Sequence, residues 1–127
     1  MNTVWMDVFD DYSNSNARLK EVLQLPLTIV TRDSSIKRFE LTFELSWKLL
    51  KSFLKDNGYV CTSPKSCLQE AFSFGLIQDD SLWFAMMNDR NSSVHTYDEA
   101  FADAMYKRIN GYLKLFQELE KEVKKHL

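Results

Sequence analysis

The segment from residue 36 to residue 54 carries apolar side chains on two nearly opposite sides of a predicted helix, and this pattern constrains the fold most. One stripe comprises Ile36, Phe39, Phe43, Trp47, Leu50 and Leu54. The other comprises Leu41, Leu45, Leu49 and Phe53. A helix that is apolar on two sides must be covered on two sides. This central helix therefore lies at the centre of a bundle, or between the core and a partner chain.

The ends and the polar face of the central helix are also indicated by its sequence. Asp33 or Ser34 can cap its start, and Gly58 fits the left-handed position just past its end. Charged residues fill the solvated wedge between the stripes. Glu44 and Lys48 are spaced there to form a favourable i,i+4 pair.

A first helix is predicted over residues 2–24, and Pro26 marks its exit because proline disfavours helical geometry in the residue before it. The polar run Ser13–Asn16 interrupts the apolar stripe of this helix. The run forms either a polar pocket or an exposed, poorly packed turn. We expect the exposed turn.

Two shorter helices follow the central one. Ser63 before Pro64 is a favourable helix start, and the third helix ends at Gly75. Asp79 or Asp80 starts a fourth helix that runs to about residue 90. The third helix is indicated by Leu68, Ala71, Phe72 and Phe74. The fourth carries Leu82, Trp83, Met86 and Met87, and we interpret its Met and aromatic content as core packing and not as a ligand site.

A long last helix is predicted from Tyr97 to about Lys125. Its apolar stripe comprises Phe101, Met105, Ile109, Tyr112, Phe116, Leu119 and Val123. Gly111 lies in its interior at a cost of about 1 kcal/mol relative to alanine, which favours a close helix contact at this position.

Composition agrees with an all-helical chain. The 127 residues include only three glycines and two prolines, too few for a turn-rich all-β domain. We therefore predict an all-α fold: an antiparallel four-helix up-and-down bundle with an additional short helix. Residues 1–127 form one domain, since no linker, internal repeat or low-complexity segment interrupts the chain.

Charge and cysteine content limit the environment and the partners. The formal net charge of −2 provides no global basic field, so any contact with nucleic acid must be local. Cys61 and Cys67 match neither zinc-type nor redox-type spacing, and we expect two ordinary thiols in a reducing compartment. We expect no secretory signal, because the first residues lack a basic region followed by an apolar run. No apolar run approaches the ~18 residues of a membrane span. We expect a cytoplasmic protein without membrane contact.

The stretch from residue 90 to residue 99 concentrates the chemically useful side chains in one break between helices. Thr96 and Glu99 match a capping box, which makes Tyr97 the first helical residue. Within a continuous helix, Arg90 and His95 would point about 140° apart. A turn at the intervening serines lets Arg90 approach His95 at the mouth of the last helix.

These residues fit the cleavage of RNA without a metal ion. A helix N-terminus favours phosphate, Arg90 supplies a fork of donors, and His95 can act as acid or base near neutral pH. Asn91 and Tyr97 can orient the phosphate or the histidine. Because one histidine cannot comfortably fill both proton-transfer roles, we expect a dimer that pairs two such breaks.

A plainer interpretation is that the break is only a structural corner. Arg90 would then satisfy carbonyl groups at its own helix end, and His95 would only cover the cap. Other phosphate chemistries lack their motifs here: no phosphate-binding loop, no His-Glu-x-x-His and no Asp-x-Asp pair occurs. We expect no cofactor and no bound metal.

With these residues in view, the chain resembles the nucleotidyltransferase substrate-binding proteins, which belong to the HEPN superfamily of all-helical domains. The specific part of the resemblance is Arg90-Asn91-x-x-x-His95-Thr96-Tyr97-Asp98-Glu99. A less specific helix pattern, Ile36-Lys37-Arg38-Phe39-Glu40 through Trp47-Lys48, precedes it. The resemblance extends from about residue 32 to the C-terminus.

The resemblance implies a homodimeric helical bundle that associates with a separately encoded minimal nucleotidyltransferase (MNT). In related pairs the HEPN protein is a ribonuclease toxin and the MNT protein is its antitoxin. Carried over by position, Arg90 and His95 match the catalytic Arg-x4-His pair, with Asn91 as the polar residue after the arginine. Tyr97 matches the tyrosine of the His-x-Tyr element to which the partner transfers AMP.

Two functions follow as expectations. In the first, the chain is the substrate-binding subunit of the nucleotidyltransferase in a toxin–antitoxin-like HEPN/MNT pair. In the alternative, it is an active metal-independent ribonuclease that cuts RNA with Arg90 and His95 at the dimer interface. RNA or a nucleotide is the expected ligand in either case.

Overall fold

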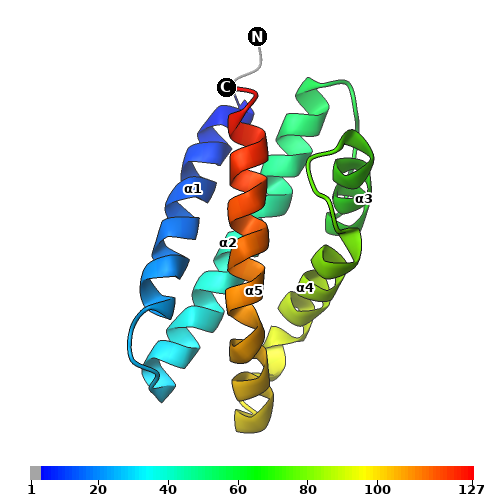
Figure 1. Cartoon of the computed structure of the whole chain (residues 1–127). Helices are drawn as coiled ribbons and strands as arrows, with labels where there is room; N and C mark the ends of the chain where they lie inside the picture. The colour runs from blue at the N-terminus through cyan, green and yellow to red at the C-terminus, as the bar shows by residue number, and fades with distance from the viewer. Residues whose placement is uncertain (1–3) are drawn as a thin grey trace.

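The computed structural model describes residues 4–127, and every regular element among them is helical. The elements are α1 (Val4–Leu23), α2 (Ile29–Asp56), α3 (Pro64–Phe74), α4 (Asp80–Ser92), the 3₁₀ turn η1 (Ser93–His95) and α5 (Glu99–Lys124). Figure 1 shows α1 descending, α2 rising, α4 descending and α5 rising in front of α2, while the short α3 lies beside the upper part of the bundle. The predicted all-α up-and-down bundle with an additional short helix is confirmed, because α1, α2, α4 and α5 form the four legs and α3 is the short helix.

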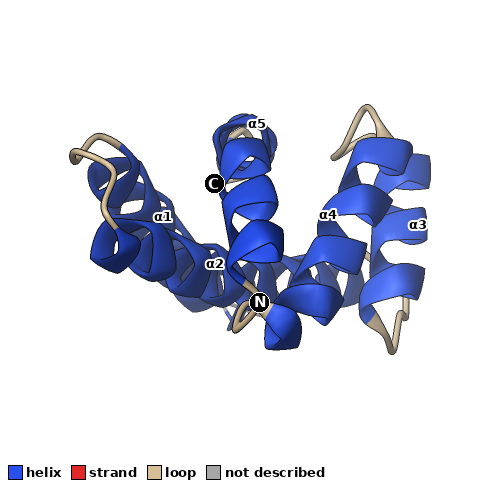
Figure 2. Ribbon diagram, turned by 90° about the horizontal axis from the view of Figure 1, so that it is seen from below, coloured by secondary structure: helices blue, strands red, loops and turns tan. Residues whose placement is uncertain are grey.

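The core lies where α1, α4 and α5 pack against α2, and α3 lies beside α4 at the edge of the bundle, as Figure 2 shows from below. The first apolar stripe of α2 is buried except for the half-buried Trp47. The second stripe is covered only in its C-terminal half: Leu49 and Phe53 are buried, whereas Leu41 is 40% exposed. Phe74 of α3 packs edge-on against Phe53, with ring centroids 5.6 Å apart. The expected cover on both sides of α2 therefore holds for part of the helix.

The core of the remaining helices follows the predicted stripes with two exceptions. The α5 residues from Met105 to Val123 on its apolar stripe are buried, and so are Trp83 and Met86 of α4. Phe72 and Leu82, which belong to the apolar patterns of the predicted third and fourth helices, are 45% and 47% exposed.

Three helix starts and two glycine ends show how far local chemistry determines the boundaries. Ser63 caps α3 and Asp79 caps α4 as predicted, while Gly58 and Gly75 adopt φ values of +87° and +96° past α2 and α3. The predicted start of α2 at Asp33 or Ser34 is wrong. Thr28 is the cap, because its extended backbone lets its hydroxyl accept from the N–H of Thr31 at 3.1 Å.

The polar run in α1 is not an exposed turn. The helix continues through it, and Ser15 and Asn16 are buried. Ser15 shares a 2.7 Å hydrogen bond with Thr42 of α2, and the Asn16 amide donates to a Glu120 carboxylate oxygen of α5 at 2.8 Å. The run is thus a buried polar contact that joins three helices. The predicted start of this helix at residue 2 lies outside the described residues.

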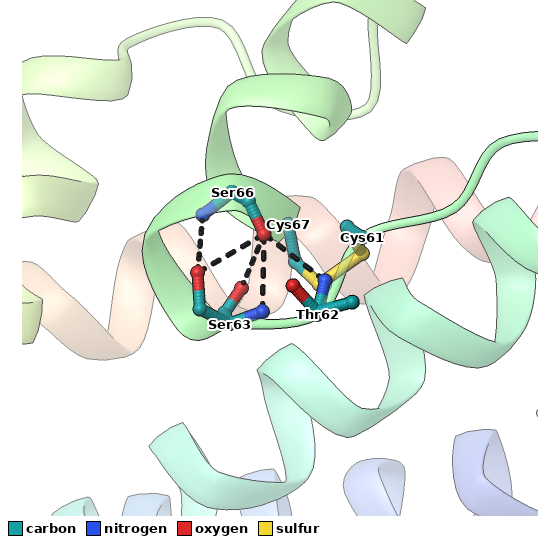
Figure 3. Close-up of a disulfide and its surroundings, with 5 residues drawn as sticks. All are labelled: Cys61, Thr62, Ser63, Ser66 and Cys67. Carbon is teal, nitrogen blue, oxygen red and sulfur yellow. Dashed lines mark hydrogen bonds between the residues drawn. A yellow bond between two sulfur atoms is a disulfide. The ribbon is translucent and has the colours of Figure 1, made fainter.

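Cys61 and Cys67 form a disulfide, so the expectation of two free thiols is wrong. The loop after α2 turns back on itself, and Figure 3 shows the Cys61 sulfur meeting the first turn of α3. Both residues are buried, and their Cα atoms are 5.1 Å apart. The Ser66 hydroxyl accepts from the N–H groups of Thr62 and Ser63, which holds the loop in this path.

Gly111 lies in an open part of the α5 surface. A Cβ added there would meet nothing within 4 Å among the described residues. The expected close helix approach at this glycine is therefore wrong. Within residues 4–127, no helix is long and apolar enough to cross a membrane.

Candidate active site

The junction between α4 and α5 is a hydrogen-bonded 3₁₀ turn. The hydroxyl of the buried Ser93 donates to the Arg90 carbonyl at 2.7 Å. The N–H and the hydroxyl of Thr96 both donate to the Ser93 carbonyl, at 3.2 and 2.9 Å. The N–H of Asp98 donates to the His95 carbonyl at 3.0 Å. Backbone and serine or threonine side chains therefore hold the loop that carries His95.

The predicted capping box of Thr96 and Glu99 is wrong. The cap of α5 is Asp98, whose carboxylate accepts from the N–H of Phe101 at 3.2 Å. The Thr96 hydroxyl is occupied by the Ser93 carbonyl instead. Tyr97 consequently lies in the turn before α5 and is not its first residue.

A buried arginine ties the start of α5 to the start of α2. Arg32 is 4% exposed, and its Nη1 donates to Glu99 at 2.6 Å and to Asp103 at 3.0 Å. Asp33 accepts from the same guanidinium, through Nε at 3.0 Å. The hydrogen bonds that Arg32 donates to Glu99 and Asp103 raise its pKa further above the ordinary value. Glu99 is thus engaged in a tertiary ion pair, which also fixes the direction in which α5 leaves the junction.

Arg90, in the last turn of α4, reaches across to α2. Its Nη2 lies 2.8 Å from Oε1 of Glu44, and the other carboxylate oxygen of Glu44 accepts from Nε1 of Trp47 at 3.1 Å. The Arg90 side chain is 29% exposed, and its Nε is buried without a hydrogen-bond partner among residues 4–127. Glu44 therefore pairs with Arg90, and the expected pair with Lys48 is replaced by this contact.

The residue before Arg90 anchors α4 to α5. Asp89 accepts from Nε and Nη2 of Arg108 at 2.7 and 2.9 Å, and from the Tyr112 hydroxyl. Burial, with the hydrogen bond to Asp89, raises the pKa of Tyr112 to about 12. The hydrogen bond to Asp89 also raises the pKa of Arg108. Asp89 and Arg90 thus reach two different helices, α5 and α2, which fixes the end of α4.

His95 and Tyr97 lie on the exposed side of the junction. Their side chains meet, with His95 Nδ1 3.3 Å from the Tyr97 hydroxyl oxygen and ring centroids 5.9 Å apart. Tyr97 is 80% exposed, and the neighbouring Val94 is 69% exposed. Asn91 is exposed in the last turn of α4.

The structure brings some of the predicted site residues together and separates others. His95 and Tyr97 are in contact, whereas no hydrogen bond or ring contact joins Arg90 to His95 among residues 4–127. Sequence reasoning placed Glu44 only in the solvated wedge and missed Asp89. The available signal for Glu44 was its position between Phe43 and Trp47, where the charged wedge borders the first apolar stripe.

The chemistry open to this surface is proton transfer and phosphate binding. An exposed imidazole can accept or donate a proton, and a partly exposed guanidinium can bind a phosphate oxygen. Within the described part of the chain, no group of three or more His, Cys, Asp or Glu side chains is arranged to hold a metal ion.

Comparison with known proteins places this helical arrangement in a family. The model of the family described as "Nucleotidyltransferase substrate binding protein like" matches residues 7–125. A protein described as "Probable ribonuclease HepT", from Haemophilus influenzae, is 38% identical over 84 residues. That match covers 62% of this chain and 58% of the Haemophilus protein, a little over half its length.

Solved structures show the same fold. A crystal structure of a Thermus thermophilus protein superposes with a TM-score of 0.81 at 37% identity, covering 85% of this chain and 94% of that one. The Haemophilus influenzae protein HI0074 superposes with a TM-score of 0.69 at 28% identity, covering 96% and 98%. HI0074 is described as having the fold of a substrate binding domain of a nucleotidyltransferase.

Proposed function

Because this chain belongs to the nucleotidyltransferase substrate-binding protein family, with a probable ribonuclease among its relatives, we propose that it is a ribonuclease that uses Arg90 and His95 and needs no metal ion. The observation that carries the proposal is the state of His95. Its ring is exposed on η1, its Nδ1 faces the Tyr97 hydroxyl, and its Nε2 has no partner among the described residues. An imidazole so placed can exchange protons with a bound substrate.

In this reaction, RNA is cleaved by two His95 side chains, one from each of two α4–α5 junctions. One His95 accepts the proton of a ribose 2′-hydroxyl, and the 2′-oxygen attacks the adjacent phosphorus. The P–O5′ bond breaks, and a second, protonated His95 gives its proton to the leaving 5′-oxygen. The products are a 2′,3′-cyclic phosphate and a 5′-hydroxyl. Arg90 stabilises the charge that gathers on the phosphorane oxygens.

The need for two histidines makes a homodimer part of the proposal. A dimer that brings the two α4–α5 junctions face to face supplies one base and one acid. The exposed Val94 and Tyr97 beside each His95 offer apolar area for such an approach. The Arg90 side chain is 29% exposed, so its guanidinium can contact a phosphate oxygen while Glu44 holds Nη2.

Cleavage of single-stranded RNA in the presence of EDTA tests the ribonuclease proposal. We expect His95→Ala to remove cleavage while the protein keeps its helical circular dichroism spectrum and melting temperature. His126→Ala is the matched control, since it removes the other histidine of the chain near the end of the last helix, and it should cleave like the wild type. Undiminished cleavage by His95→Ala would overturn the assignment.

A second candidate function is specifically favoured by the exposure of Tyr97. With 80% of its surface accessible, its hydroxyl can be reached by another protein. We propose that a separately encoded minimal nucleotidyltransferase binds this chain and transfers AMP to Tyr97. The phenol oxygen attacks the α-phosphorus of ATP, pyrophosphate leaves, and the phenolic proton passes to a base of the transferase. In this role the chain is the substrate-binding subunit of the pair.

Mass spectrometry after co-expression with the partner transferase tests this second role. We expect the mass of one AMP on the peptide that contains Tyr97, and none in Tyr97→Phe. Tyr59 is 46% exposed, so Tyr59→Phe is a control that should still be modified. If Tyr97→Phe acquires as much AMP as the wild type, Tyr97 is not the acceptor.

A further inference from the structure

A groove between α1 and α2 gathers basic side chains around an aromatic ring. It has a volume of about 430 Å³ and is lined by Val4 and Val8 of α1 and by Trp47, Lys48, Lys51 and Lys55 of α2. The spacing of the lysines along α2 places them on one side of the helix, spread over about 10 Å at 1.5 Å per residue. The groove is therefore long enough to follow an extended chain.

The three lysines form a local positive surface in a chain whose net charge is −2. All three are exposed, and none forms an ion pair among the described residues. The acidic groups nearest along α2 are engaged elsewhere: Glu44 binds Arg90, and Asp56 accepts from Nε1 of Trp5 at 3.2 Å. Ammonium groups left without carboxylate partners can bind phosphates and release their counterions.

Trp47 gives the groove an aromatic surface. Trp5 and Trp83 are 3% and 2% exposed, whereas Trp47 is half-buried. Its Nε1 donates to Glu44, which fixes the orientation of the ring, and Nζ of Lys51 lies 5.9 Å from the ring centroid. Grooves that combine cations along a backbone with aromatic rings on which bases stack are typical of single-stranded nucleic acid binding.

A hydrogen bond and an ion pair through Glu44 link the groove to the candidate active site. Glu44, one helical turn before Lys48, connects Trp47 at the end of the groove with Arg90 on α4. We propose that this α1–α2 groove binds the phosphate backbone of single-stranded RNA and leads it towards Arg90. The inference rests on the proposed ribonuclease function, for which it names the substrate-binding surface.

Binding of a fluorescent 2′-O-methyl oligouridine to the full chain tests the groove, because this probe lacks the hydroxyl needed for cleavage. We expect the triple variant Lys48→Ala/Lys51→Ala/Lys55→Ala to bind at least about tenfold more weakly at moderate salt. The slope of log affinity against log salt concentration should fall by about 2, since each phosphate contact on a single strand contributes about 0.7.

The matched control removes the same charge from a different groove. Lys20, Lys121 and Lys124 line a pocket of about 390 Å³ between α1 and α5 and are exposed as well. Their triple alanine variant should bind within about twofold of the wild type, since it removes no proposed phosphate contact. If both triple variants bind oligouridine equally weakly, the effect comes from overall charge, and the proposal that the groove binds RNA is overturned. Absence of oligouridine binding by the wild type would overturn it as well.

Two further readouts separate the groove from the ribonuclease proposal. Oligouridine should quench tryptophan fluorescence in the wild type and much less in Trp47→Phe, since Trp5 and Trp83 are buried. With cleavable RNA, the Lys48, Lys51 and Lys55 variant should raise KM and leave kcat unchanged. If the triple lysine variant cleaves RNA with the wild-type KM, the groove does not bind the substrate, and the ribonuclease proposal still stands. If the wild type binds oligouridine through the groove but cleaves no RNA, the ribonuclease proposal alone is refuted.

Discussion

Replacing Asp89 by asparagine removes the charge that holds the end of α4 against α5. The aspartate side chain is 15% exposed and receives three donors, two from Arg108 and one from Tyr112. Asparagine has the same shape but only one acceptor oxygen, and its amide group would face N–H or O–H donors. We expect Asp89→Asn to destabilise the fold and to loosen the turn that carries Arg90.

The magnitude can be worked from these contacts. Arg108 is 44% exposed, so solvent screening reduces its ion pair with Asp89 to about 1 kcal/mol at most. The bond from the largely buried Tyr112 to a charged acceptor is worth about 1.5–2 kcal/mol more. We therefore expect a loss of about 2–3 kcal/mol in the free energy of unfolding. For a chain of this length, that loss lowers the melting temperature by roughly 6–12 °C.

Urea unfolding followed by circular dichroism measures this loss. The exposed Asp10, which has no hydrogen-bond or ion-pair partner within residues 4–127, provides the matched control, and Asp10→Asn should stay within about 0.5 kcal/mol of the wild type. In a Tyr112→Phe background the cost of Asp89→Asn should fall by about 1.5–2 kcal/mol, because the shared hydrogen bond is already gone. A loss below about 1 kcal/mol for Asp89→Asn, or costs that simply add in the double variant, would show that Asp89 does not hold α4 to α5 through Tyr112.

Three further outcomes are expected. Gly75→Ala should lower the free energy of unfolding by about 1–2 kcal/mol, because φ at this position is +96°. Gly111→Ala should raise it by about 0.5–1 kcal/mol, because the position is helical and open. Urea unfolding of the two variants measures both changes. The pKa of Tyr112 is raised to about 12 from 10, so its stabilising contribution is complete below pH 10 and is lost as pH rises through 12. Unfolding of wild type and Tyr112→Phe should therefore converge across that pH range. Reducing the Cys61–Cys67 disulfide should lower stability by about 2 kcal/mol, measured by melting with and without dithiothreitol.

Much of the fold follows from local patterns. The 3.6-residue periodicity of apolar residues located every α-helix that the structure describes, since burial of one stripe is the dominant requirement on an amphipathic helix. Ser63, Asp79 and Gly75 mark helix ends in the structure as they do in the sequence. Each acts through its own backbone neighbourhood, and no distant contact is needed to decide its role.

Where two local choices competed, distant contacts decided. Glu99 could have closed a capping box on Thr96, but it lies 2.6 Å from Arg32 of α2, and Asp98 caps α5 instead. The α1 polar run could have been an exposed turn, but Ser15 meets Thr42 across the helix interface. In both cases a charged or polar partner from another helix determines the outcome, and periodicity carries no information about that partner.

At the candidate site, too, the sequence located the residues and tertiary contacts decided their partners. The residues from Arg90 to Tyr97 are contiguous, so the sequence alone located the break and its reactive side chains. Only the tertiary structure decided that Arg90 binds Glu44 while His95 meets Tyr97. The reason is physical: a helix break brings neighbours along the chain together. The direction of a long side chain such as arginine, however, depends on which opposite charge another helix places within reach.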